Sequence, residues 1–207
     1  MKLSKLIETL ISEFREGFDL KLFLHMKSFA QQVRYANSNL RRMASGSARI
    51  IYEISDDRVL KLAKNAKGIA QNEVEGDWGL QSMYGDIISK VVEEDKEYRW
   101  IVSQRAKKIT KSEFKSLVGI DIDTFFIVLK VDLANHKFTY LSIDKEVLEK
   151  VRSLEFYDRI TRMCRDFDLE IGDFGRISSY GEVDGHIVIT DYGLTSTVYQ
   201  EFYRRGR

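Results

Sequence analysis

Paired short strands near residue 50 limit the folds that this chain can adopt. Four segments are strand-like, and each pair is joined by a polar turn or loop: 49–54 and 59–63 around Ser55-Asp56-Asp57, and 87–92 and 98–102 around residues 93–97. Residues 71–81, between the two pairs, have helical spacing. The pattern predicts a small antiparallel sheet with one helix packed against it.

Helical patterns flank this predicted sheet on both sides. Apolar residues at helical spacing predict two N-terminal helices within residues 1–40, with a break at Gly17 and Asp19. The later part is mainly helical and ends in a β-hairpin around Asp184-Gly185, a dipeptide suited to a type I′ turn. Its predicted features are a capping box at Thr110 and Glu113, an Asp123 cap on residues 124–131, an ambiguous segment 135–142, a long helix over 144–168, and strands 180–183 and 186–190.

Composition excludes several classes of protein. Lysine and arginine number 33 and aspartate and glutamate 32 in 207 residues, so the balance lacks the basic excess of a nucleic-acid binder. The apolar runs are shorter than the roughly 20 residues of a membrane span, and the N-terminus does not read as a secretory signal. The single cysteine, Cys164, predicts a cytoplasmic protein without disulfides and lies in an apolar helical stripe, so we interpret it as a buried structural thiol. Three histidines and one cysteine argue against a zinc site.

Chemistry-bearing residues occur in a fixed order along the chain. A turn of small residues at 45–48 precedes the first strand, the returning strand carries Lys61, and the following helix carries Glu73 and Glu75. Asp173 and Asp191 stand at the two ends of the predicted C-terminal hairpin, which would bring both carboxylates to one place. Phosphoryl transfer requires a cation on the phosphates, carboxylates for a metal and a positioned acceptor, and this order supplies all three.

The order and spacing of these pieces resemble the protein-kinase and aminoglycoside-phosphotransferase superfamily over about residues 42–199. The resemblance implies an α+β, two-lobed kinase-like fold and a phosphotransferase that uses ATP and Mg²⁺. It implies that Lys61 grips the phosphates and pairs with a helix glutamate, preferably Glu75 with Glu73 as the alternate. It also implies that Asp173 orients the acceptor hydroxyl and that Asp191 binds the metal.

Further sites follow from the same resemblance. It implies that the nucleotide is contacted by Ser45, Gly46 and Ser47 in the turn, and by Gln104 and Ala106 after the last strand of the sheet. Ser178 stands where the family has a metal-binding asparagine, so it is the second predicted metal ligand beside Asp191. The sequence departs from the family in the single glycine of its turn and in Ile171-Gly172-Asp173 at the catalytic loop.

The resemblance predicts three regions: a helical extension at 1–41, a kinase-like N-lobe at 42–106 and a truncated C-lobe at 107–207. Residues 194–207 are too few for a peptide-binding platform, so we expect an acceptor from another protein, a small acceptor or one within this chain. The alternative is a catalytically inactive pseudokinase or interaction module. A third hypothesis is nucleotidyl transfer. The sequence also resembles compact kinase-like proteins of tailed bacteriophages, which would place it in a host cytoplasm or a virion.

Overall fold

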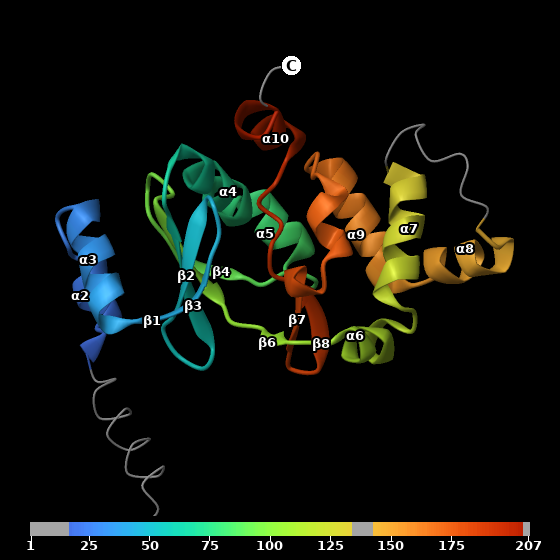
Figure 1. Ribbon diagram of the computed structural model, residues 1–207, viewed down its shortest axis with the longest axis horizontal. Coiled ribbons are helices and arrows are strands. Elements are labelled where there is room, and N and C mark those ends of the chain that lie inside the picture. The colour runs from blue at the N-terminus through green and yellow to red at the C-terminus, as the bar shows by residue number, and fades with distance from the viewer. Residues whose placement is uncertain (1–16, 134–142, 205–207) are drawn as a thin grey trace, which may run out of the picture.

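An antiparallel sheet of five strands forms the centre of the N-terminal half in the computed structural model, which describes residues 17–133 and 143–204 (Figure 1). The strands are β1 (Arg41–Ser45), β2 (Arg49–Glu53), β3 (Arg58–Ala63), β4 (Val91–Glu94) and β5 (Trp100–Gln104), in the spatial order β1-β2-β3-β5-β4. β2, β3 and β5 match the predicted strands closely. β1 is an addition, since its exposed, arginine-rich sequence has no apolar alternation.

One face of the sheet packs on α2 (Leu20–Leu24) and α3 (Phe29–Asn39). The apolar contact joins Phe23 and Ala36 of these helices to Tyr52, Leu60, Leu62, Trp100 and Val102 of the strands. The apolar stripe from residue 22 to 40 predicted one helix, and this prediction is wrong. The segment forms two helices, because Ser28 caps α3 by accepting a hydrogen bond from the Gln31 amide. The helix predicted for residues 3–14 lies outside the described residues.

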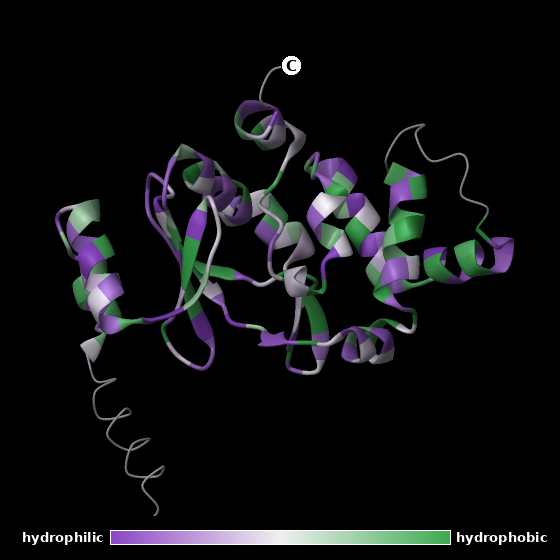
Figure 2. Ribbon diagram, viewed as in Figure 1, coloured by the Kyte–Doolittle hydropathy of each residue, from purple (hydrophilic) through white to green (hydrophobic). Residues whose placement is uncertain are grey.

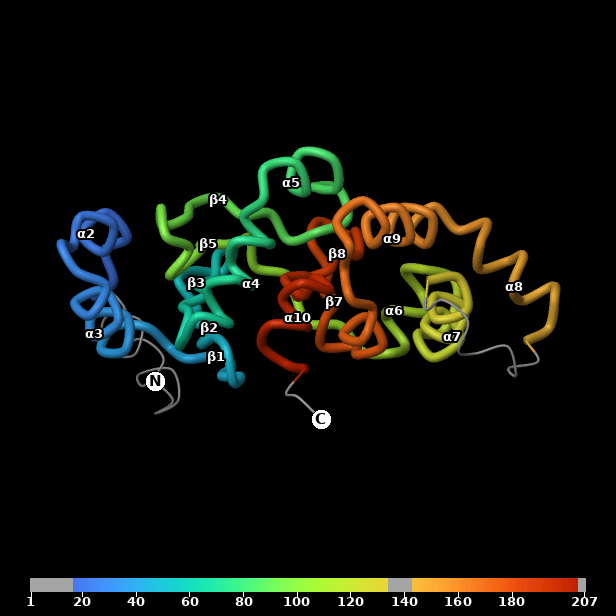
Figure 3. The backbone as a smooth tube through the Cα atoms, turned by 90° about the horizontal axis from the view of Figure 1, so that it is seen from above, coloured from blue at the N-terminus to red at the C-terminus, as the bar shows by residue number. Residues whose placement is uncertain are grey.

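The other face is crossed by α4 (Ala66–Gly76), which leads into α5 (Trp78–Tyr84) (Figure 3). The predicted single helix over 71–81 is therefore two helices, because Asp77 ends α4 and caps α5 through the Leu80 amide. α4 approaches the turn between β1 and β2 closely at Gly68, where a Cβ atom would lie 2.2 Å from the Ala48 carbonyl oxygen. Glycine is required there, and the close approach fixes the turn against the helix.

The C-terminal half is mainly helical, with one small three-stranded sheet in the order β6-β7-β8. Its elements are β6 (Lys107–Lys108), α6 (Lys111–Val118), α7 (Ile122–Leu133), α8 (Lys145–Arg152), α9 (Glu155–Asp166), the 3-10 turns η2 (Ile171–Gly175) and η3 (Ile177–Ser179), β7 (Tyr180–Val183), β8 (His186–Ile189) and α10 (Ser196–Phe202). The five-stranded sheet followed by this part confirms the predicted α+β class.

Local signals in the C-terminal half are partly as predicted. The capping box at Thr110 is present, and the hairpin turn has positive φ angles of 51° at Asp184 and 81° at Gly185. The cap of α7 is Asp121, not the predicted Asp123, because the Asp121 side chain accepts from the Thr124 amide. The predicted helix over 144–168 is wrong as one element: it is divided between α8 and α9. The ambiguous segment 135–142 lies outside the described residues.

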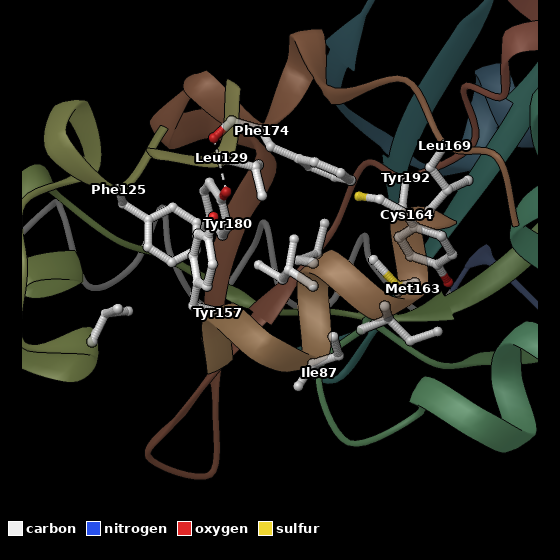
Figure 4. Packing of buried hydrophobic residues seen from close by; sticks show 14 of the residues in the cluster. Ile87, Phe125, Leu129, Tyr157, Met163, Cys164, Leu169, Phe174, Tyr180 and Tyr192 are labelled. Carbon is white, nitrogen blue, oxygen red and sulfur yellow. Dashed lines mark hydrogen bonds between the residues drawn. The ribbon is translucent and has the colours of Figure 1, made fainter. Parts of the chain in front are cut away.

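A second apolar core joins the C-terminal helices to the β7–β8 hairpin and α5 (Figures 2 and 4). Phe114 and Phe125 contact Tyr180 and Tyr157 edge-on in this core. Cys164 is buried among these side chains, and burial raises the pKa of its thiol, as expected for a structural cysteine. Within the described ranges, no helix has both the length and the apolar character needed to cross a bilayer.

Candidate active site

Lys61 lies at the middle of β3, on the sheet face that α4 covers. Its ammonium nitrogen is 2.5 Å from Glu75 Oε2 and 2.8 Å from the main-chain oxygen of Thr190. Both charged side chains are buried, whereas Glu73 is exposed on the same helix. The structure therefore pairs Lys61 with Glu75, the preferred of the two predicted partners.

Arg49 is the site residue that sequence reasoning missed. Its guanidinium is buried between two carboxylates, with Nη1 2.8 Å from Glu75 Oε1 and Nη2 2.8 Å from Asp191 Oδ1. Nη1 also donates to Asn72 Oδ1 at 3.3 Å. A signal for Arg49 exists in the register: Arg49 pairs with Ala63 and Ile51 with Lys61, so Arg49 and Lys61 share a face once the two strands are aligned.

These neighbours shift the two cations in opposite directions. Burial and the nearby Arg49 charge lower the pKa of Lys61 despite the opposing effect of Glu75. For Arg49, burial acts to lower the pKa, but the carboxylates of Glu75 and Asp191 outweigh it and leave the pKa raised. The cluster therefore favours the charged form of Arg49 more strongly than that of Lys61.

The β7–β8 hairpin brings Asp173 and Asp191 together from either end. The Ser179 hydroxyl donates to the Asp173 carbonyl at 2.8 Å, and the Thr190 amide donates to the Ser179 carbonyl at 2.8 Å. The pKa of Asp173 is raised by burial and by the charge of Asp191, against the opposing charge of Arg176 at 3.1 Å. The charge of Asp191 thus acts on the Asp173 carboxyl from the other end of the hairpin, and their predicted joint role at a metal and an acceptor stays a prediction.

Tyr192 fixes the segment that carries Asp191. Its hydroxyl donates to the Ser89 carbonyl and accepts from Gln81 Nε2, both at 2.8 Å. Gly193 lies against α4, where a Cβ atom would be 2.5 Å from the Gln71 carbonyl oxygen. The Asp191-Tyr192-Gly193 segment is therefore held between α4, α5 and the strand junction.

The predicted phosphate-covering turn is exposed and tied to the start of α4. Lys64 Nζ donates to the Gly46 carbonyl at 2.8 Å, and Lys67 Nζ donates to the Ser47 hydroxyl at 2.7 Å. The Gly46 amide donates to the Arg49 carbonyl at 2.9 Å, within the hairpin itself. Ser45 ends β1 beside them. A nucleotide contact from Ser45, Gly46 or Ser47 stays a prediction.

The structure does not bring Gln104 or Ala106 into contact with the charged cluster. The Gln104 amide donates to the Lys90 carbonyl at 2.8 Å, and the Gln104 carbonyl accepts from the Ser89 hydroxyl at 2.5 Å. Ala106 lies against Gly181 of β7, where an added Cβ would be 2.5 Å from the Ala106 methyl group. Their predicted contact with a nucleotide is untested.

The Mg²⁺ ion that the resemblance implies does not fit the donor set around Asp191. The Asp191 Oδ1 atom already forms an ion pair with the Arg49 guanidinium. The Ser178 side chain is exposed and makes no hydrogen bond to any residue that the structure describes. The hydroxyl of its neighbour Ser179 donates a hydrogen bond to the Asp173 carbonyl. Among residues 17–133 and 143–204, no group of three histidine, cysteine, aspartate or glutamate side chains is arranged to hold a metal.

A pocket of about 380 Å³ lies elsewhere, between the α2–α3 connection and the β4–β5 turn. It is lined by charged side chains such as Glu93, Asp95 and Arg99, together with Phe29 and Trp100. It opens on the side of the sheet that faces α2 and α3. None of the predicted site residues lines it.

Known proteins resemble this chain only in structure and at low sequence identity. No family model matches the chain, and no curated protein matches it. The solved structures that are similar to it include the following two. The streptomycin–ATP–APH(2'')-IIa ternary complex is 16% identical with a TM-score of 0.37, covering 81% of this chain and 71% of the other. SAICAR synthase from Saccharomyces cerevisiae, complexed with SAICAR, is 14% identical with a TM-score of 0.39, covering 74% and 73%. Both TM-scores are below 0.5, so neither likeness carries a functional assignment.

Proposed function

We propose that this chain is an ATP-dependent phosphotransferase of the kinase-like kind. The observation that carries the proposal is the buried ion pair between Lys61 and Glu75, whose lysine also bonds the carbonyl directly before Asp191. Buried ion pairs contribute little net stability, because the desolvation of both charges offsets their attraction. A buried pair beside two interacting carboxylates is instead typical of a site that handles a charged substrate.

In this proposal, each residue of the cluster has one task. Lys61 and Arg49 place positive charge on the phosphates, and Glu75 holds both cations in position. The acceptor hydroxyl oxygen attacks the γ-phosphorus, the bond to the β–γ bridging oxygen breaks, and ADP leaves. The hydroxyl proton passes to Asp173, whose raised pKa makes it a better proton acceptor than an ordinary aspartate.

The remaining predicted parts belong to the proposal as well. Ser45, Gly46 and Ser47 would cover the phosphates, and Gln104 and Ala106 would approach the base. The boundaries 1–41, 42–106 and 107–207 would divide an extension, an N-lobe and a C-lobe. No step is assigned to Mg²⁺ or to Ser178, because the donors around Asp191 do not favour a metal.

The test is incubation of the pure protein with ATP labelled at the γ or the α position. We expect γ label to appear in released phosphate or on an acceptor, and the rate to fall at least about 100-fold in Asp173→Asn and in Lys61→Met. Matched controls are Asp123→Asn and Lys108→Met, which change exposed residues outside the cluster and should leave the rate unchanged. Transfer of α label would favour nucleotidyl transfer instead. Transfer that survives both site substitutions would exclude the assignment.

One observation favours a second candidate, a catalytically inactive interaction module. The Arg49 guanidinium already neutralises Asp191, so the cluster is electrostatically complete without a nucleotide. In this case the protein would show no transfer from either label, no change in melting temperature with ATP and a stoichiometric protein partner. The resemblance to bacteriophage kinase-like proteins fits either candidate and stays a prediction.

A further inference from the structure

Arg49 links three segments that are far apart in the sequence. It begins β2, and its guanidinium reaches Glu75 and Asn72 on α4 and Asp191 after β8. The Arg49 side chain is only 8% exposed and its partner Glu75 is fully buried, whereas Asp191 is half exposed, so the guanidinium joins an interior carboxylate to one at the surface. Burying the charge of an arginine costs free energy, so a buried arginine at this position suggests a role other than stabilising the fold.

Asp191 is the residue on which a divalent cation would be expected, yet a guanidinium lies on it. The Nη2–Oδ1 distance of 2.8 Å is that of a direct charge-assisted hydrogen bond. The other predicted ligand, Ser178, is exposed, and its hydroxyl is not held toward Asp191 by a hydrogen bond to any described residue. Mg²⁺ demands near-octahedral oxygen coordination and gives up its water reluctantly, so two carboxylates, each of them paired with an arginine, would hold it weakly.

Positive charge is concentrated where the phosphates would lie. Beside Arg49 and Lys61, the ammonium groups of Lys64 and Lys67 bond the turn at Gly46 and Ser47. Two cations thus lie within the charged cluster, and two more lie at the turn that the proposed function places over the phosphates. A guanidinium presents its donors in a rigid planar fork that matches phosphate oxygens, which a lysine cannot do.

We propose that Arg49 takes the place of a divalent cation, so that the phosphates of a nucleoside triphosphate bind this site directly and without Mg²⁺. This inference rests on the proposed function, because it assumes that the Lys61 site receives the nucleotide. Arg49 holds Asp191 in the free protein and offers its remaining donors to the phosphates in the complex. Lys61 and the two turn lysines supply the rest of the compensating charge.

The experiment is calorimetric titration of the full chain with a non-hydrolysable ATP analogue, once in excess Mg²⁺ and once in EDTA. We expect the two dissociation constants of the wild-type protein to agree within about tenfold. In Arg49→Met the constant in EDTA should rise at least about tenfold, and binding should become dependent on Mg²⁺. The matched control is Arg41→Met, since Arg41 also pairs with a carboxylate of the same sheet, Glu53, but lies outside the cluster.

Arg49→Lys guards against a folding defect, because it keeps a positive charge beside Glu75 but loses the planar fork; it should show an intermediate loss in EDTA. Circular dichroism and thermal melting verify the fold of each variant. Wild-type binding that disappears in EDTA but persists in Mg²⁺ would overturn the inference and leave the proposed function standing. Absence of binding in both buffers would overturn the nucleotide site itself, and with it both proposals.

Discussion

The two faces of the central sheet are built from the same strands but differ in chemistry at the centre of β3. Toward α2 and α3, Leu60 and Leu62 of β3 contact apolar side chains and are almost fully buried. Toward α4, the residue between them, Lys61, meets a buried carboxylate. Because successive side chains of a strand point to opposite faces, one hexapeptide serves both surfaces.

The two kinds of buried side chain contribute very differently to the stability of the molecule. Each fully buried leucine contributes about 1.5–3 kcal/mol by removal of apolar surface from water. A buried ion cluster often contributes nothing net, and apolar replacements of similar volume are frequently more stable. Folding alone therefore accounts for the face toward α2 and α3, whereas net stability does not account for the buried charges on the face toward α4.

The largest effect is expected from removing the carboxylate at the centre of the charged face. Glu75→Ala leaves Lys61 and Arg49 buried without their shared partner, which should lower the free energy of unfolding by about 3–5 kcal/mol. Glu73→Ala, on the exposed side of the same helix, should change it by less than about 0.5 kcal/mol. Urea denaturation measures both. Equal losses would show that Glu75 has no special role in holding the cations.

A cavity on the apolar face should cost slightly less and leave the site intact. Leu60→Ala should lower the free energy of unfolding by about 2–4 kcal/mol through lost burial and the cavity that remains. Val92→Ala, at a half-exposed position of β4, should cost below about 1 kcal/mol. Nucleotide affinity per folded molecule should not change in either variant. A loss of affinity in Leu60→Ala would mean that the two faces are coupled through the strand.

A smaller effect is expected where α10 contacts the outer side of α4. Gln71 Nε2 donates to the Tyr203 hydroxyl at 3.0 Å, and Lys67 lies 4.5 Å from the centre of the Tyr203 ring. Tyr203→Phe removes only the hydrogen bond and should lower the free energy of unfolding by up to about 1 kcal/mol. Tyr199→Phe is the control, because the Tyr199 hydroxyl bonds no described residue. Identical melting curves for both variants would argue that α10 does not stabilise α4.

Much of this comparison could be predicted from the sequence, because the signals are local. The polar turn at Ser55-Asp56-Asp57 and the positive-φ pair Asp184-Gly185 define two hairpins. Lys61 and Glu75 are on the elements expected of them and do meet. Helix breaks were harder, since the apolar spacing continues across Ser28 and across the junction of α8 and α9.

The contact of Arg49 with Asp191 and the strand β1 could not be predicted, because both depend on pairings outside the β2–β3 hairpin. Arg49 reaches Asp191, which lies far along the chain, and only the completed sheet and hairpin bring them together. β1 has a polar sequence and becomes a strand by pairing with β2, with Arg41 opposite Glu53 and Ser45 opposite Ile50. Such pairings arise from the whole fold and leave no periodicity in the segment itself.

The smallest expected change has the opposite sign and tests the cost of the charged face directly. Burial and the charge of Asp191 raise the pKa of Asp173, so the folded protein binds a proton at this carboxyl more tightly than the unfolded chain does. Stability from this group is thus fully present below the ordinary aspartate pKa of about 3.9 and is lost as the pH rises through the raised folded-state value.

Asp173→Asn removes the charge that causes this loss of stability. It should therefore raise the melting temperature at pH 7 while abolishing transfer, and the advantage should vanish near pH 3. Asp123→Asn, which removes an exposed carboxylate paired with Lys111, should give no such gain. A lower melting temperature for Asp173→Asn at pH 7 would mean that the ionised carboxylate stabilises the fold, and the distinction between the two faces would fail at this residue.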